Sequence, residues 1–124
     1  MNAETGRPVV LIVEDEFLIR MDSVDAIRSA GFDVVEAEDA DQAILILENR
    51  PDITIVFTDV QMPGSMDGLK LAAAVRGRWP PIKIIIVSSL VRRAEHVLPV
   101  NSRFLAKPYH AEKLISEIGL LMAA

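Results

Sequence analysis

Short apolar runs alternate along the chain with longer segments in which apolar residues recur every three or four positions. A continuous run is typical of a strand buried on both faces of a sheet, and the wider spacing is typical of an amphipathic helix. The first run, Val9-Val10-Leu11-Ile12-Val13, contains no polar residue at all. The pattern predicts strands over residues 9–13, 33–37, 53–59, 82–87 and 103–106.

Each predicted strand is followed by a segment with helical periodicity. Gly31 and Pro51 lie just beyond two of these segments and are typical helix stops, while Asp67 is a candidate N-cap for a third. A weak, short helix is expected near residues 91–97. The other helices would pack through the following apolar faces: Phe17, Met21, Val24 and Ile27; Ala40, Ala43, Ile44 and Leu47; Leu71, Ala72 and Val75; Leu114, Ile115, Ile118, Leu121 and Met122.

Strict alternation of strands and helices predicts an α/β fold in which helices cover both faces of a parallel sheet. We expect a doubly wound, parallel, five-stranded sheet in the order 2-1-3-4-5. A chain of 124 residues suffices for one such domain and is too short for two. The domain is expected over residues 8–124, preceded by a flexible N-terminal segment at residues 1–7.

Two of the predicted strands end in acidic residues. Glu14 and Asp15 follow the first strand, and Asp59 closes the third. In doubly wound sheets, ligands bind beyond the carboxyl ends of the strands, where the strand order reverses, so these carboxylates should meet in one pocket. Like charges about 4 Å apart repel by roughly 4 kcal/mol at an effective dielectric of about 20, which calls for a compensating cation. All-oxygen ligation suits Mg²⁺ best.

Two further polar residues are expected at the same edge. Ser88 follows the fourth strand and Lys107 the fifth. A hydroxyl can donate to a phosphoryl oxygen, and an ammonium can neutralise one. Taken singly, Ser88 is more often a helix cap, Lys107 a solvated side chain, and each acid an ordinary loop residue. Their shared position at one edge favours a phosphate site.

The motifs that occupy these strand ends resemble those of the receiver domain of bacterial two-component response regulators, of the single-domain type with a flavodoxin-like strand order. They are short, but their order and spacing cover nearly the whole chain. The matching segments are Glu14-Asp15-Glu16, Asp59 with Met62-Pro63, Met66-Asp67-Gly68, Ser88-Ser89 and Lys107-Pro108-Tyr109.

The resemblance implies a phosphoacceptor role for Asp59, which would receive a phosphoryl group from a sensor histidine kinase or a histidine phosphotransfer protein. Mg²⁺ would be held by Asp15, by Asp59 and by the backbone carbonyl of Gln61, with Glu14 contributing through water. Such a chain is a signalling domain rather than an enzyme, although it promotes its own phosphorylation and a slow autodephosphorylation.

The resemblance also implies how the signal would leave the site. Ser88 and Lys107 would bind the phosphoryl oxygens, and movement of Ser88 would let the switch aromatic, Phe104, rotate inward. Phe104 as plain core filler stays open. The Lys107-Pro108 bond is expected to be cis. A downstream protein target would read the altered surface.

Two regions depart from the family pattern. The loop after Asp59 carries an apparent extra residue at Gly64-Ser65, and the stretch between Leu90 and Arg103 is short. The second departure affects the usual dimer face, so we expect at most a weak homodimer. Leu90 would shield the phosphoryl group from water, which predicts slower dephosphorylation than in a Leu90→Glu variant.

Composition limits the kinds of partner and the cellular location that we expect for the domain. A net charge of −5 argues against direct nucleic-acid binding, and the absence of cysteine excludes thiolate chemistry. No segment approaches the roughly 20 apolar residues that span a bilayer. We therefore expect a soluble, cytoplasmic protein without membrane insertion.

Two other function classes fit the sequence less well than a phosphorylation-switched signalling domain. An aspartyl-phosphate phosphatase would need a second aspartate two residues after Asp59, where this chain has Gln61. A nucleotide or flavin protein would need a glycine- or hydroxyl-rich loop after the first strand, where this chain has acids. Within the leading class, Met1 and the end at Ala124 favour a stand-alone regulator. A phosphate shuttle in a relay and a receiver from a hybrid kinase stay open.

Overall fold

A parallel, five-stranded sheet forms the centre of the computed structural model, which describes residues 8–64, 66–88 and 102–123. The strand order is β2-β1-β3-β4-β5, as the sequence predicts. The elements of the sheet are β1 (Val9–Val13), β2 (Asp33–Ala37), β3 (Ile53–Asp59), β4 (Lys83–Ser88) and β5 (Ser102–Ala106).

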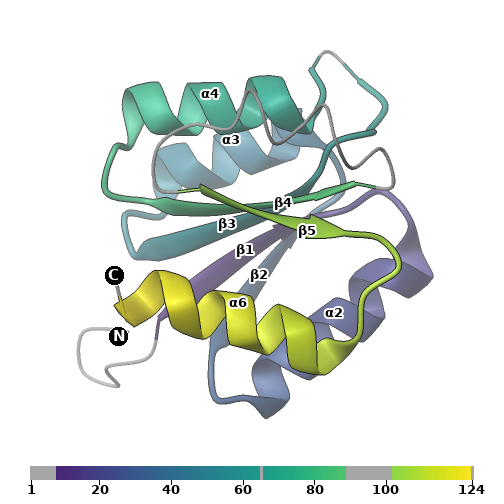
Figure 1. Cartoon of the computed structure of the whole chain (residues 1–124). Helices are drawn as coiled ribbons and strands as arrows, with labels where there is room; N and C mark the ends of the chain where they lie inside the picture. The colour runs from purple at the N-terminus through teal and green to yellow at the C-terminus, as the bar shows by residue number, and fades with distance from the viewer. Residues whose placement is uncertain (1–7, 65, 89–101, 124) are drawn as a thin grey trace.

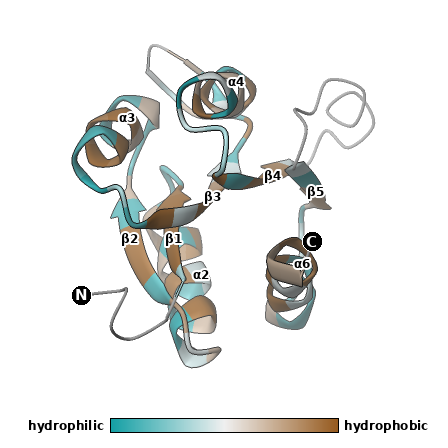
Figure 2. Cartoon of the chain, turned by 90° about the vertical axis from the view of Figure 1, so that its left-hand side faces the viewer, coloured by the Kyte–Doolittle hydropathy of each residue, from teal (hydrophilic) through white to brown (hydrophobic). Residues whose placement is uncertain are grey.

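Helices cover both faces of this sheet. Figures 1 and 2 show α3 and α4 together on one face, and α2 and α6 on the other. This arrangement confirms the doubly wound α/β fold. The bounds of these helices are α2 (Phe17–Ser29), α3 (Ala40–Asn49), α4 (Gly68–Arg78) and α6 (Ala111–Ala123).

The continuous apolar runs are explained by the two-sided burial of the strands. Side chains alternate along a strand, so Leu11 belongs to the core beneath α3 and α4, while Ile12 belongs to the core beneath α2 and α6. All five residues of β1 are fully buried. In Figure 2 the central strands are accordingly coloured as hydrophobic over much of their length. A rigid, buried centre of this kind fixes where each strand ends.

Individual residues determine where the helices begin and end. Gly31 ends the turn after α2 with φ +99°, a left-handed conformation that favours glycine. The side chain of Asp67 accepts a hydrogen bond from the Lys70 amide at 2.9 Å, which confirms its predicted N-cap role. Asp39 caps α3 in the same way through the Gln42 amide.

The predicted core face of α2 is wrong at two positions. Phe17 and Met21 are 59% and 42% exposed, whereas the polar residues Arg20 and Ser23 are buried beside Val24 and Ile27. The helix is therefore rotated relative to the apolar face read from the sequence. Inward-pointing polar side chains with partners of their own, described below, account for this rotation.

The prediction that Met122 packs on the apolar face of the last helix is also wrong, because its side chain is exposed. Other differences from the sequence are small. Strand β4 begins and ends one residue later than predicted, and β5 begins one residue earlier. The expected helix at residues 91–97, Leu90, Ser65 and the segment 1–7 lie outside the described residues. Within the described ranges, no helix has the length and apolar character to cross a membrane.

Candidate functional site

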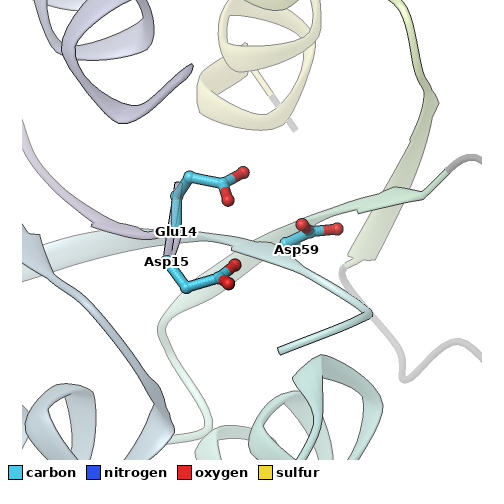
Figure 3. Close-up of side chains that lie close together, drawn as sticks. All are labelled: Glu14, Asp15 and Asp59. Atoms are coloured by element: carbon cyan, nitrogen blue, oxygen red, sulfur yellow. The ribbon is translucent and has the colours of Figure 1, made fainter. Parts of the chain in front are cut away.

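Three carboxylates meet at the carboxyl edge of the sheet. Glu14, Asp15 and Asp59 each offer an oxygen, and these oxygens lie within 4.8 Å of one another. Figure 3 shows the Glu14 and Asp15 side chains branching from consecutive residues and Asp59 facing them from the neighbouring strand. Glu14 and Asp59 are buried, whereas Asp15 is exposed. The acids that the sequence predicts to converge are thus brought together.

The strand register explains this convergence. Strands β1 and β3 are neighbours, and Val13 pairs with Thr58. Because both strands run in the same direction, the residues that follow this pair, Glu14 and Asp59, lie side by side at the carboxyl edge of the sheet. Glu14 and Asp59, 45 positions apart in the chain, become neighbours through one backbone pairing.

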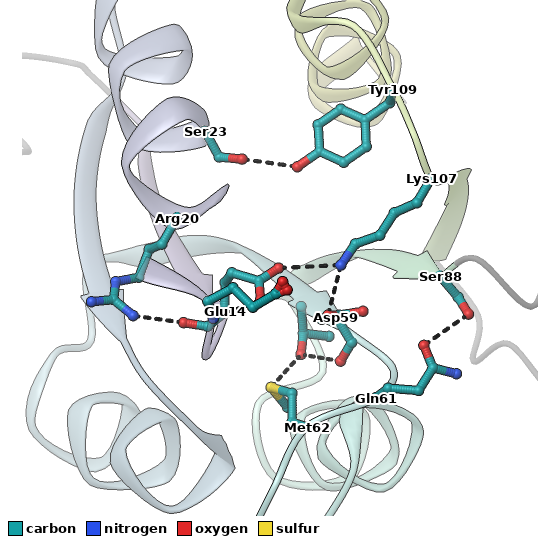
Figure 4. Close-up of polar contacts among 11 residues, drawn as sticks. Glu14, Arg20, Ser23, Asp59, Gln61, Met62, Ser88, Lys107 and Tyr109 are labelled. Atoms are coloured by element: carbon teal, nitrogen blue, oxygen red, sulfur yellow. Dashed lines mark hydrogen bonds and ion pairs between the residues drawn. The ribbon is translucent and has the colours of Figure 1, made fainter. Parts of the chain in front are cut away.

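Lys107 provides a positive charge within the acid cluster. Its Nζ lies 2.8 Å from Oδ2 of Asp59 and 3.4 Å from Oε1 of Glu14, as drawn in Figure 4. Burial acts to lower the pKa of Lys107, but its hydrogen bond to Asp59 and the charges of Asp59 and Glu14 outweigh burial and raise that pKa. The ammonium is therefore held charged beside the aspartate.

Ser88 and Lys107 are placed at the same edge by the next pair of strands. Ser88 pairs with Ala106, and the Lys107 amide donates to the Ser88 carbonyl at 3.0 Å. The Lys107-Pro108 peptide bond is cis, as expected. The buried Ser88 hydroxyl donates to Oε1 of Gln61 at 3.3 Å. The loop after β3 and the end of β4 are thereby linked.

Burial and charge act together on Glu14. Burial raises the pKa of Glu14 above its ordinary value of 4.5, and the charge of Asp59 raises it further. The hydrogen bond from the Glu16 amide and the charge of Lys107 act in the opposite direction. The net upward direction of the Glu14 pKa therefore comes chiefly from burial of its carboxyl group.

The donor set fits a hard divalent cation. With all groups ionised, three carboxylates against one ammonium leave a formal charge of −2 in the cluster. In addition, Oδ1 of Asp59 is buried and has no hydrogen-bond partner within the described residues. A buried acceptor without a partner costs about 1–3 kcal/mol, and a cation bound by oxygen ligands would remove that cost.

Phe104 lies on β5, the edge strand of the sheet. It is half-buried and packs against the core beneath α3 and α4. This placement is compatible with both readings of Phe104, a switch residue and a core residue. The carboxyl end of β5, two residues further along, leads directly into Lys107.

Two contacts of the site are not apparent from the sequence pattern. Arg20 of α2 donates to the backbone carbonyl of Glu14 at 2.7 Å, and Ser23 shares a 2.8 Å hydrogen bond with the Tyr109 hydroxyl. Both are visible in Figure 4. The available signal was a polar residue at positions 20 and 23, in helical phase with Val24 and Ile27. Periodicity alone assigns such residues to the surface.

Comparisons with known proteins agree with this geometry. A family model for the response regulator receiver domain matches residues 10–119. The sensor kinase CckA of Brucella abortus is 37% identical over 118 residues, 92% of this chain and 12% of that protein. The transcriptional regulatory protein PdtaR of Mycobacterium tuberculosis is 37% identical over 120 residues, 92% of this chain and 56% of that protein. The chain thus spans about half of one relative and a small part of the other.

Relatives of similar length are also found. The response regulator receiver protein CpdR of Brucella abortus is 29% identical over 118 residues, which cover 93% of this chain and 97% of that protein. A solved response regulator receiver protein from Sinorhizobium medicae superposes with a TM-score of 0.87 at 25% identity, covering 97% and 98% of the two chains. The receiver domain of the hybrid histidine kinase CckA superposes with a TM-score of 0.77 at 29% identity, covering 91% and 97%. The chain belongs to the response regulator receiver domain family of two-component systems.

Proposed function

We propose that Asp59 accepts a phosphoryl group from a sensor histidine kinase or a histidine phosphotransfer protein in a Mg²⁺-dependent reaction. One observation carries this proposal. Asp59 is buried, its Oδ1 has no hydrogen-bond partner within the described residues, and its Oδ2 is held by a charged lysine. A carboxylate so placed has one oxygen neutralised and the other available for a new bond.

In the transfer step, a carboxylate oxygen of Asp59 forms a bond to phosphorus. The bond from phosphorus to the donor's leaving atom breaks, and its electron pair stays with the leaving group. For a phosphohistidine donor, the leaving atom is an imidazole nitrogen, which takes up one proton from solvent. Phosphoryl transfer depends mainly on positioning and charge neutralisation, and Lys107, 2.8 Å from Asp59, supplies both.

Mg²⁺ would be held by Asp15 and Asp59, by the backbone carbonyl of Gln61, and through water by Glu14. When bound, the ion neutralises charge on the phosphoryl oxygens. The supporting observations are the convergence of carboxylate oxygens within 4.8 Å and the excess negative charge of the cluster. The chain's own contribution is the oxygen ligand set and its placement on the ends of rigid strands.

The signal would leave the site through Ser88. Its hydroxyl contacts Gln61 at 3.3 Å, and binding to a phosphoryl oxygen would require it to give up that contact. We propose that this movement is passed along β4 and β5 to Phe104, which is paired with Ile86 in the sheet, and then to a downstream protein target. On this proposal the chain is a signalling domain of the cytoplasm, with autodephosphorylation as a side activity.

The receiver domain can act as a separate protein or as one part of a phosphorelay. Similarity to CpdR, which covers 97% of that protein, keeps open a regulator made of a receiver alone. Similarity to part of the sensor kinase CckA keeps open a receiver that passes phosphoryl groups on within a relay. The phosphoacceptor chemistry is the same in both settings.

The proposal predicts that acetyl phosphate adds one phosphoryl group to the protein only when Mg²⁺ is present. Intact-mass spectrometry of the native protein should show this adduct, and Asp59→Asn should abolish it. Asp67→Asn is a matched control, because Asn also caps a helix well and Asp67 lies outside the acid cluster. An unmodified native protein at saturating Mg²⁺, or equal labelling of Asp59→Asn, would contradict the proposal.

A further inference from the structure

Arg20 is a buried arginine whose guanidinium bridges two elements next to the acid cluster. Its side chain is 10% exposed. Its Nη1 atom donates to the Glu14 carbonyl at 2.7 Å, and its Nε atom donates to Oε1 of Glu36 on β2 at 3.0 Å. Its guanidinium carbon lies 5.6 Å from the centre of the Phe17 ring. A charged group in this setting has its direction fixed by three separate contacts.

The Glu14 carbonyl is part of the peptide unit that joins Glu14 to Asp15. Peptide units are planar, so holding the carbonyl oxygen sets the plane from which the Asp15 backbone leaves. On the other side, the Glu14 amide donates to the Ala37 carbonyl at 3.1 Å, which continues the β1–β2 pairing beyond the strand. The peptide groups on both sides of Glu14 are thus tied, directly or through Arg20, to β2.

A third bond completes the turn. The Glu16 amide donates to Oε2 of Glu14 at 3.0 Å, so the loop folds back on its own first acid. Asp15, between these residues, is exposed, and its position depends on the backbone around it. We propose that Arg20 is a positioning residue for the cation site, because its guanidinium fixes the Glu14-Asp15 peptide plane and thereby aims Asp15 at Asp59. This inference rests on the proposed function.

The shape of the guanidinium, not only its charge, is required for this role. A fork of several N–H donors can reach a carbonyl and a carboxylate at once, whereas an ammonium is a single point charge on a shorter side chain. Arg20→Lys therefore keeps the charge and loses the bridge. If Arg20 acted only by offsetting the acids, the lysine would serve as well.

The test is Mg²⁺ binding measured by calorimetry, together with amide hydrogen exchange of the metal-free protein. Loss of a group that orients a metal ligand typically weakens binding about 10- to 100-fold, so Arg20→Lys should bind Mg²⁺ at least about tenfold more weakly. In the metal-free protein, the Glu16 amide should exchange faster. The rate of acetyl phosphate labelling should return toward the native rate at saturating Mg²⁺, because the chemistry beyond cation binding is unchanged.

The chain supplies a matched control in Arg78. This arginine also pairs with a glutamate of another element, Glu48, at 2.8 Å and lies over an aromatic ring, that of Trp79, at 4.4 Å. These contacts of Arg78 are to Glu48 and Trp79 and not to residues 14–16, so Arg78→Lys should leave Mg²⁺ affinity and Glu16 exchange unchanged. Glu36→Ala provides a second, milder variant that removes only the β2 anchor and should weaken binding less than Arg20→Lys.

The possible outcomes distinguish failure of the proposed function from failure of the positioning role of Arg20. If the native protein binds no Mg²⁺, the proposed function fails, and the exchange of Glu16 still reports whether Arg20 holds the loop. If the native protein binds Mg²⁺ and both Arg20→Lys and Glu36→Ala bind it equally well, the positioning role is overturned. Should Arg20→Lys be too unstable to measure, Glu36→Ala decides, because Glu36 is 42% exposed and its truncation disturbs little packing.

Discussion

The two carboxylate oxygens of Asp59 differ in their hydrogen bonding, and this difference suits the residue to form a new bond. Oδ2 accepts from Lys107, while Oδ1 is buried without a partner within the described part of the chain. A single lysine cannot balance three neighbouring acids. The site thus combines an aspartate that has an available oxygen, a fixed ammonium, and an excess of negative charge that a divalent cation would balance.

Replacing Lys107 should change cation binding and phosphorylation in opposite directions. An ammonium and a divalent cation about 5 Å apart repel by about 1–2 kcal/mol even in water, so Lys107→Met should bind Mg²⁺ up to roughly tenfold more tightly. The same variant should be phosphorylated more slowly by acetyl phosphate, because one neutralising group is lost. Calorimetry and intact-mass time courses measure the two effects. Weaker Mg²⁺ binding in Lys107→Met would contradict the assigned charge role.

At the scale of elements, the start of α4 sits directly against the end of β3. The Gly68 amide donates to the Val60 carbonyl at 2.8 Å, and a Cβ built on Gly68 would lie 1.8 Å from the Asp59 carbonyl oxygen. Backbone atoms cannot yield as a flexible side chain can. Strand β3, which ends at Asp59, and the following helix therefore approach closely only because residue 68 is glycine.

Gly68→Ala should lower the free energy of unfolding by about 1–3 kcal/mol, the usual cost of overpacking, and should also slow phosphorylation by displacing Asp59. Gly77→Ala in the same helix is the control, because nothing lies within 4 Å of its built Cβ. That substitution should stabilise the protein by about 0.5–1 kcal/mol, since alanine favours helix. Urea unfolding of both variants checks the opposite signs, and equal effects would refute the close approach.

The elements also show what a sequence can and cannot reveal. The sequence was enough to predict strands β1 and β3, because strands buried on both faces leave continuous apolar runs. It also predicted the strand order, and neighbouring strands in that order bring Glu14 next to Asp59. The orientation of α2 was not predictable. Its inward face contains Arg20 and Ser23, whose partners, the Glu14 carbonyl and the Tyr109 hydroxyl, belong to segments that only the fold brings near.

At the scale of the whole molecule, α6 is held to β5 through a buried acid. Glu117 is 3% exposed and pairs with Arg103 and Lys113. Burial alone would raise the pKa of Glu117, but hydrogen bonds from Arg103 and Lys113 outweigh burial and lower that pKa below its ordinary 4.5. In the pH range below 4.5 the unfolded chain therefore holds more protons at this residue than the native protein.

Stability contributed by Glu117 should be complete above pH 4.5 and decline as the pH falls through the lower native pKa. Near neutral pH, Glu117→Gln should lower the free energy of unfolding by about 1–3 kcal/mol, as expected for lost charged hydrogen bonds. Urea unfolding of both proteins across this pH range would show the gap between them closing in acid. A gap that stays constant with pH would mean that Glu117 is not ionised in the native protein.

Phosphorylation of Asp59 can be tested through the chemical identity of residue 59 after treatment with acetyl phosphate. Borohydride reduces an aspartyl phosphate to homoserine, so the protein treated with acetyl phosphate and Mg²⁺, then reduced and digested, can be read by peptide mass spectrometry. We expect homoserine at position 59, and none in a sample prepared without Mg²⁺. Homoserine at another aspartate, or unmodified Asp59 in a protein that carries the phosphoryl mass, would contradict this expectation.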